Sequence, residues 1–149
     1  MVVRVQRDDF DIGREMDALL AGRRDIGGVA SFTGLVRAFS DARNVGALTL
    51  EHYPGMTEKA LAAIEAEARE RFDIQASLIV HRFGRMEPGE RIVLVIAASA
   101  HRGEAFRAAE FLMDWLKTKA PFWKSEETPD GPQWVEARAA DDNAVERWS

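Results

Sequence analysis

The chain has 149 residues, of which 46% are hydrophobic and 30% charged, and this length and composition suit a single domain spanning residues 1–149. The formal net charge of −5 argues against general nucleic-acid binding, and no apolar run approaches the roughly 20 residues that a membrane span requires. The absence of cysteine excludes disulfides, thiolate zinc sites and a cysteine nucleophile, and because no secretory signal is evident we expect a cytoplasmic protein.

Hydrophobic spacing predicts the elements of the first half of the chain. Valines predict a short strand over residues 2–5, and helical spacing predicts a short helix within residues 10–20, closed by Gly22. We expect an extended, buried segment over residues 26–37, a mobile loop over residues 38–46 and an alternating strand over residues 47–53.

In the second half, Thr57 is the expected cap of a helix that ends near residue 72. Two strands follow, over residues 74–83 and 91–99, joined by a turn rich in glycine and proline. The second strand is continuously apolar, which predicts a central strand covered on both faces. The next helix should end near Ala120, because Pro121 pushes the residue before it out of the helical region. A last strand over residues 132–138 and a polar, flexible tail over about 141–149 complete an α+β fold.

The apolar strand over 91–99 runs into His101 and Arg102, which begin the following helix. Ligands of α/β structures often bind at the carboxyl end of a strand, and an arginine there can grip a phosphate through two hydrogen bonds. The alternative is a water-exposed pair at a helix start, and the residues alone favour neither interpretation.

Lys117 and Lys124 flank the break at Pro121, so a turn of the chain would let both side chains converge on one pocket. A lysine amine in a pocket can stabilise a developing anion or transfer a proton. The plainer interpretation, that lysines near a helix end complement the helix dipole, is favoured by the residues alone; it accounts well for Lys117 and Lys119 and poorly for Lys124.

Other candidates have plain structural interpretations. Phe122 and Trp123 could stack on a flat heterocycle, but aromatic residues beside a turn are more often core anchors. His52 and His81 lie on predicted strands without a second ligand at metal spacing, and we interpret both as structural. We therefore expect neither a metal nor a cofactor.

Five strings of the sequence resemble the large, catalytic subunit of the molybdopterin synthase family, in the same order along nearly the whole chain. They are SFTGLVR (31–37), LTLEHYPGMTEKAL (48–61), SAHR (99–102), DWLKTKAPFWK (114–124) and WVEAR (134–138). The resemblance implies an α/β-hammerhead fold with an additional small β-containing subdomain. It also implies a homodimer of this chain that carries a small ubiquitin-like subunit at each end, forming a heterotetramer.

The resemblance further implies a sulfurtransferase of molybdenum cofactor biosynthesis. The small subunit's C-terminal Gly-Gly tail would carry a thiocarboxylate, and two sulfur transfers would convert cyclic pyranopterin monophosphate into the dithiolene of molybdopterin. No nucleic acid or membrane would take part. The lack of cysteine in this chain agrees with sulfur arriving on another molecule.

Site residues follow from the same resemblance, position by position. Lys117 matches the family lysine nearest the thiocarboxylate, and Lys124 matches the second active-site lysine. The residues expected to contact the pterin or its phosphate, besides these lysines, are Leu35, Val36, Arg37, His101, Arg102, Ser125 and Glu126. His101 and Arg102 would come from across the dimer interface. This chain has Ser125 where family members often have a basic residue, and residues 38–46 match no family string.

Two other hypotheses stay open from the sequence. The chain could be a carrier of a pterin or nucleotide phosphate without chemistry, or a scaffold that only holds a small ubiquitin-like partner. Product formation that depends on Lys117 would separate the enzyme from both.

Overall fold

A computed structural model describes residues 2–40, 43–135 and 139–148 of the chain. Its larger sheet has the strand order β1–β6–β8–β2, in which β1 is parallel to β6 and the other neighbours are antiparallel. These strands are β1 (Val2–Gln6), β6 (Ala76–Arg82), β8 (Arg91–Ser99) and β2 (Gly28–Leu35). β8 is the apolar strand that the sequence predicts, and its central position is confirmed.

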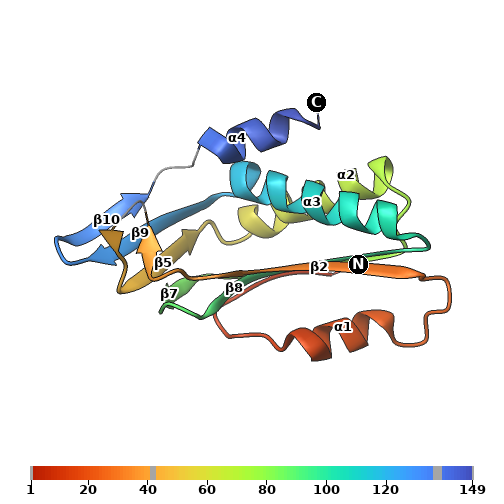
Figure 1. Ribbon diagram of the computed structural model, residues 1–149, viewed down its shortest axis with the longest axis horizontal. Coiled ribbons are helices and arrows are strands. Elements are labelled where there is room, and N and C mark those ends of the chain that lie inside the picture. The colour runs from red at the N-terminus through yellow and green to blue at the C-terminus, as the bar shows by residue number, and fades with distance from the viewer. Residues whose placement is uncertain (1, 41–42, 136–138, 149) are drawn as a thin grey trace.

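Helices cover both faces of this sheet (Figure 1). α2 (Met56–Arg71) and α3 (Arg102–Lys119) lie on one face, and α1 (Ile12–Leu20) lies on the other. Alternation along β6 explains the layers, because Ile79 packs in the cluster under α2 and α3 whereas Leu78 and Val80 pack in the cluster under α1.

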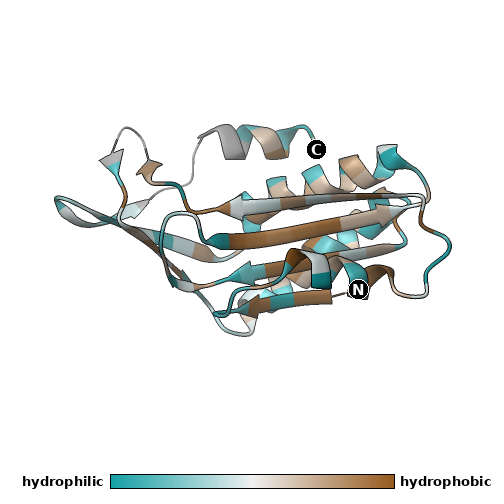
Figure 2. Cartoon of the chain, turned by 60° about the horizontal axis from the view of Figure 1, so that its bottom comes forward, coloured by the Kyte–Doolittle hydropathy of each residue, from teal (hydrophilic) through white to brown (hydrophobic). Residues whose placement is uncertain are grey.

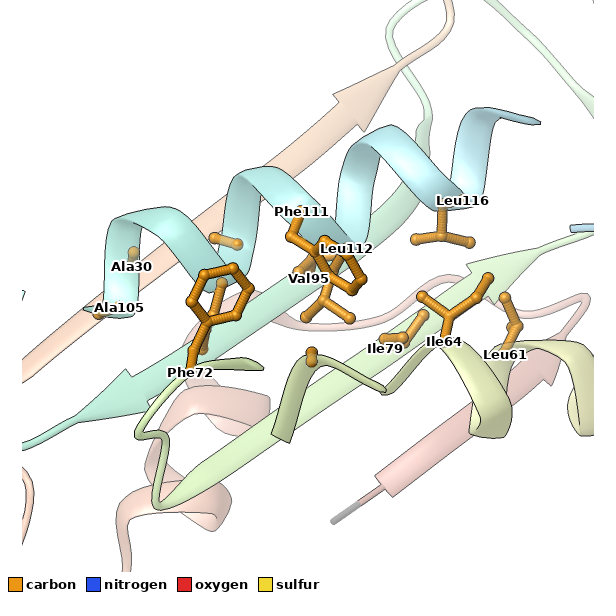
Figure 3. Packing of buried hydrophobic residues seen from close by; sticks show 14 of the residues in the cluster. Ala30, Leu61, Ile64, Phe72, Ile79, Val95, Ala105, Phe111, Leu112 and Leu116 are labelled. Carbon is orange, nitrogen blue, oxygen red and sulfur yellow. The ribbon is translucent and has the colours of Figure 1, made fainter. Parts of the chain in front are cut away.

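The core under α3 fixes the position of that helix. Phe111, Leu112 and Leu116 point from α3 toward the sheet and α2, where Ile79 and Val95 meet them (Figure 3). Complete burial of each such side chain contributes about 1.5–3 kcal/mol, so the last turn of α3 is held firmly against the sheet. The hydropathy colouring shows the same distribution, with brown concentrated along the long strands of the sheet (Figure 2).

A second sheet, all antiparallel, has the order β10–β9–β5–β7. Its strands are β10 (Gly131–Val135), β9 (Phe122–Thr128), β5 (Ala47–His52) and β7 (Gly84–Met86). Leu48, Leu50 and Met86 on its inner face pack with Val36, which follows β2, in a separate cluster. The fold is thus α+β, with a small β-containing unit beside the main layers (Figure 1).

Two predictions for loops and turns are corrected. Within the predicted loop over 38–46, β3 (Phe39–Ser40) pairs antiparallel with β4 (Arg43–Asn44), and the predicted turn over 84–90 contains β7. β9 was not predicted at all. These strands are short or carry charged residues, so they lack the apolar alternation that marks a strand. β7 and β9 form by pairing with β5, and β3 and β4 pair with each other.

Thr57 does not cap α2, contrary to the prediction. Gly55, at φ +84°, is the cap residue, and its backbone N–H donates to Glu58 Oε2 at 2.6 Å. Thr57 lies inside the first turn, fully buried, and its hydroxyl donates to the Tyr53 carbonyl at 2.8 Å. A buried hydroxyl needs a partner, and here the backbone just after β5 provides one.

The C-terminal segment, predicted to be a polar, flexible tail, forms a helix that packs against the domain. α4 (Ala139–Glu146) packs against α3, and Trp148 is only 9% exposed. The indole of Trp148 donates to Asp114 at 2.6 Å and meets the rings of Phe72 and Phe111 edge-on. Among the described residues, no helix is both long and apolar enough to cross a membrane.

Candidate functional site

Lys117 and Lys124 come from two elements that meet where the sheets join. Lys117 is exposed in the last turn of α3, and the backbone becomes extended at Ala120, before Pro121, as predicted. The chain then enters β9, which carries Lys124, half-buried, opposite Leu50 of β5. The predicted break between the two lysines is therefore confirmed.

Strand register determines what surrounds Lys124. Directly opposed residues of antiparallel strands share a face, and so do residues two apart. Because His52 opposes Phe122 and Leu50 opposes Lys124, the side chains of His52, Phe122 and Lys124 lie on one face of the second sheet. This is the inner face, since Leu50 belongs to its buried cluster.

His81 reaches the same place from the larger sheet. Its side chain follows those of Ser77 and Ile79 on the face of β6 that α2 and α3 cover. It is the last residue on that face before the strand ends. Its ring stacks on Phe122, with centroids 3.9 Å apart and planes inclined by 18°. The end of β6 is thereby joined to the start of β9.

The electrostatics of His81 link it to both lysines. Burial, followed by the positive charges of Lys117, Lys124 and the neighbouring His52, lowers the pKa of His81 to about 3, although its hydrogen bond to the Arg82 carbonyl opposes the shift. Nδ1 of His81 donates that bond at 2.9 Å. The ring is therefore neutral near pH 7, and Nε2 has its lone pair available.

His52 is held from the opposite side by α2. Its Nδ1 lies 3.1 Å from Thr57 Oγ1 and 3.9 Å from a carboxylate oxygen of Glu58. Its ring is 4.3 Å from that of Phe83 and 6.1 Å from that of Phe122. We define the lysine–histidine site as Lys117, Lys124, His52, His81 and Phe122.

His101 and Arg102 lie at the other end of α3. Arg102 and Lys117 are fifteen residues apart on one helix, which corresponds to about 22 Å along its axis. Both His101 and Arg102 are exposed, beside the start of β2, where the Cα of Arg102 lies close to Gly28. Within one chain, these two residues do not join the lysine–histidine site.

Residues 35–37 lie toward the lysine end of the sheet. Leu35 pairs with Arg91 at the start of β8, two residues before the partner of His81. Val36 is buried in the cluster of the second sheet, whereas Leu35 is 53% exposed and Arg37 is exposed. Arg37 is therefore accessible at this end of the molecule.

Ser125 and Glu126 divide between the two faces of β9. Glu126 shares the inner face with Lys124 and is 6% exposed, whereas Ser125 points to the outer face, opposite Trp134. A ligand on the inner face would thus meet the side chain of Glu126 and not that of Ser125.

Sequence reasoning missed the histidines as members of this site. His52 and His81 were interpreted as structural because neither has a metal partner nearby in sequence. Recognition of β9 as a strand would have put Phe122 and Lys124 on one face, but the pairing of β9 with β5 and the stacking of Phe122 on His81 bring the histidines there. Among the described residues, no group of three or more His, Cys, Asp or Glu side chains could hold a metal ion.

Comparison with known proteins identifies relatives of the whole chain. A protein of Pseudomonas aeruginosa named molybdopterin synthase catalytic subunit is 56% identical over 148 residues, which cover 99% of each chain. The solved molybdopterin biosynthesis MoaE protein of Burkholderia ambifaria is 53% identical and superimposes with a TM-score of 0.84, covering 99% of this chain and 97% of its own. The solved molybdopterin synthase of Staphylococcus aureus is 30% identical, with a TM-score of 0.82, covering 89% of this chain and 95% of its own. The family model described as MoaE protein matches residues 5–119. The chain therefore belongs to the MoaE protein family.

Proposed function

We propose that this chain is the catalytic subunit of a molybdopterin synthase. In this reaction, sulfur passes from the C-terminal thiocarboxylate of a small ubiquitin-like subunit to cyclic pyranopterin monophosphate, which becomes the molybdopterin dithiolene. The observation that carries the proposal is the convergence of Lys117 and Lys124, from α3 and β9, on the stacked pair of His81 and Phe122. The name catalytic subunit, which the Pseudomonas relative carries, supports both the activity and a second kind of subunit.

Charge explains why such a reaction needs this site. A thiocarboxylate and a phosphate-bearing pterin are both anions, so they repel one another as they approach. The two lysines of the site offset that repulsion and raise the local concentration of both reactants. Arg37, exposed at the same end of the sheet, is the third cation that we assign to substrate binding.

Lys117 is the residue that we assign to the release of sulfur from the small subunit. When water attacks the acyl carbon of the small subunit's terminus, an oxyanion forms, and an ammonium group near it stabilises that charge in the transition state. Lys124, half-buried on the inner face, would hold the pterin and its phosphate together with Glu126.

A second copy of the chain would complete the site. Because His101 and Arg102 are about 22 Å from Lys117 along α3, they can serve the same substrate only from another protomer. We therefore propose a homodimer with two sites. In each site, one protomer contributes the end of α3 that carries Lys117, and the other contributes the start of its α3, with His101 and Arg102. Two small subunits complete a heterotetramer.

A reconstituted assay tests the proposal. The chain is mixed with thiocarboxylated small subunit and cyclic pterin, and dithiolene product is measured for the natural chain, Lys117→Ala and Lys119→Ala. Lys119 lies in the same helical turn and contacts the face of Trp115, so its variant is the matched control. We expect Lys117→Ala to lower the rate by roughly 10²–10³-fold, as removal of an oxyanion-stabilising group does, and Lys119→Ala to retain it.

The other hypotheses predict different results in the same assay. A phosphate carrier would bind the pterin and form no product, and a scaffold would bind the small subunit without affinity for the pterin. Either result with the natural chain would overturn the proposed activity.

A further inference from the structure

Water must enter the proposed reaction, and the described site offers a group to receive its proton. In the sulfur transfer, the thiocarboxylate sulfur displaces an oxygen substituent from a pterin carbon, the carbon–oxygen bond breaks with its electron pair going to oxygen, and the acyl carbon of the small subunit stays bonded through sulfur to the pterin. Water then adds to this carbon, a carbon–oxygen bond forms, and the carbon–sulfur bond breaks with its electron pair going to sulfur. One proton of the water must be accepted as its oxygen attacks, and the other leaves for solvent from the new carboxylic acid.

The hydrogen bonds around Thr57 determine the tautomer of His52. The Thr57 hydroxyl gives its one proton to the Tyr53 carbonyl at 2.8 Å and accepts the Tyr53 backbone N–H at 3.1 Å. Its remaining lone pair can only accept, so Nδ1 of His52, at 3.1 Å, is the donor. In neutral His52, Nε2 is then the nitrogen with a free lone pair.

Glu58 supplies charge to the same nitrogen. One of its carboxylate oxygens lies 3.9 Å from Nδ1 of His52, and the other is fixed by the backbone N–H of Gly55 at 2.6 Å. A carboxylate beside Nδ1 stabilises the imidazolium that forms when Nε2 takes a proton, as in acid–base triads. The His52 side chain is only 8% exposed, whereas that of Glu58 is 43% exposed, so solvent screens this attraction in part.

His81 lacks this support. Its Nδ1 faces a neutral backbone carbonyl, and its low pKa, about 3, reflects burial and the two nearby lysines. It would remain uncharged during the reaction. Of the two histidines, only His52 combines an oriented ring with an anionic neighbour.

The charged groups around His52 come from several elements. Glu58 faces it from α2, Lys124 lies diagonally across on β9, and His81 adjoins it from β6. Diagonal neighbours on paired strands are about 7–8 Å apart, which a lysine side chain can span. Arg7 lies over the ring of Phe83, which packs beside His52, and its guanidinium carbon is 4.7 Å from the centroid of that ring.

We propose that Nε2 of His52 accepts the proton of the attacking water, with Thr57 and Glu58 orienting the ring. This inference rests on the proposed function, since it assigns a residue to one step of that reaction. The proton-transfer step would then depend on residues of β5 and α2, in addition to the two lysines of α3 and β9.

Asparagine variants test it with matched geometry. Asparagine at 52 or 81 keeps an amide nitrogen near the position of Nδ1, so the bond to Thr57 or to the Arg82 carbonyl survives while Nε2 is removed. In the complete assembly, we expect His52→Asn to lower the rate by about 10²-fold, since general bases contribute roughly 10²–10⁴. The acidic limb of its pH–rate profile should flatten, whereas His81→Asn should retain that limb.

Two further readouts separate chemistry from folding. Because the water step would be slowed, His52→Asn should accumulate small subunit still bonded to the pterin, visible as added mass on the intact subunit. Glu58→Gln keeps an acceptor for Gly55 but removes the carboxylate that stabilises the imidazolium as it forms, so its rate should also fall and the same adduct should accumulate. A rate loss in His52→Asn with an unchanged profile and no adduct would overturn the inference, as would an unchanged rate in Glu58→Gln. If the natural chain forms no product, the proposed function fails and this inference fails with it.

Discussion

The ring of His81 stacks on the ring of Phe122 at a centroid distance of 3.9 Å. This contact joins the last residues of β6 in the larger sheet to the first residue of β9 in the smaller one. Lys124 follows Phe122 on the same face, and Lys117 approaches from the end of α3. The contact thus helps to determine the relative positions of the two lysines at the junction of the sheets.

The pH dependence of stability should report the neutral state of His81. The unfolded chain binds a proton at this residue near pH 6.5, whereas the folded chain does so only near pH 3. Between these values the unfolded state binds more protons, so the free energy of unfolding falls as pH falls, by up to about 1.4 kcal/mol per pH unit.

Urea unfolding of the natural chain and of His81→Asn measures this component. The difference in unfolding free energy, natural minus variant, should rise with pH between pH 4 and 6.5 and level off above. A difference that is the same at every pH would show that His81 titrates alike in both states.

Mixing two inactive variants tests the dimeric site. If Lys117 and Arg102 act from different protomers, a dimer of Lys117→Ala with Arg102→Ala contains one intact site and one doubly altered site. After free subunit exchange, about a quarter of the natural activity should return, since half of the dimers are mixed and each has one working site of two. Each variant alone is the control. If both residues acted within one chain, mixing would restore nothing.

Substrate binding should weaken as salt rises. The screening length falls from about 8 Å near physiological ionic strength to about 3 Å at 1 M, so exposed cations such as Lys117 and Arg37 lose their attraction for the pterin phosphate. We expect KM for the pterin to increase at least about threefold between 0.05 and 0.5 M sodium chloride. Circular dichroism at each salt concentration checks that the fold is retained. A KM independent of salt would contradict the electrostatic explanation.

The docked C-terminus should contribute substantially to stability. Trp148 is 9% exposed, contacts two aromatic rings and donates to Asp114, so Trp148→Ala should cost about 3–5 kcal/mol of unfolding free energy. Trp134 is 67% exposed, and Trp134→Ala is the matched control, expected within about 0.5 kcal/mol of the natural chain. Equal effects of the two substitutions in denaturant titrations would argue against a docked tail.

The sequence by itself was enough to predict several helices and strands and to identify the family. The continuous apolar run predicted β8 with its bounds, 91–99, and the geometry before Pro121 predicted the end of α3. The strings around Lys117 and Lys124 identified the family and thereby the two lysines. These signals are short-range, because dihedral preferences, apolar periodicity and matching strings are all properties of neighbouring residues.

Only the tertiary structure decided which residues share a site. His52, His81 and Lys124 are far apart in sequence, and they meet because β9 pairs with β5 and Phe122 packs on β6. Arg102 and Lys117 lie near opposite ends of α3, so the rise of the helix keeps them apart within one chain. Pairing of β9 and burial of Trp148 draw their free energy from distant partners, so neither could be recognised from local sequence.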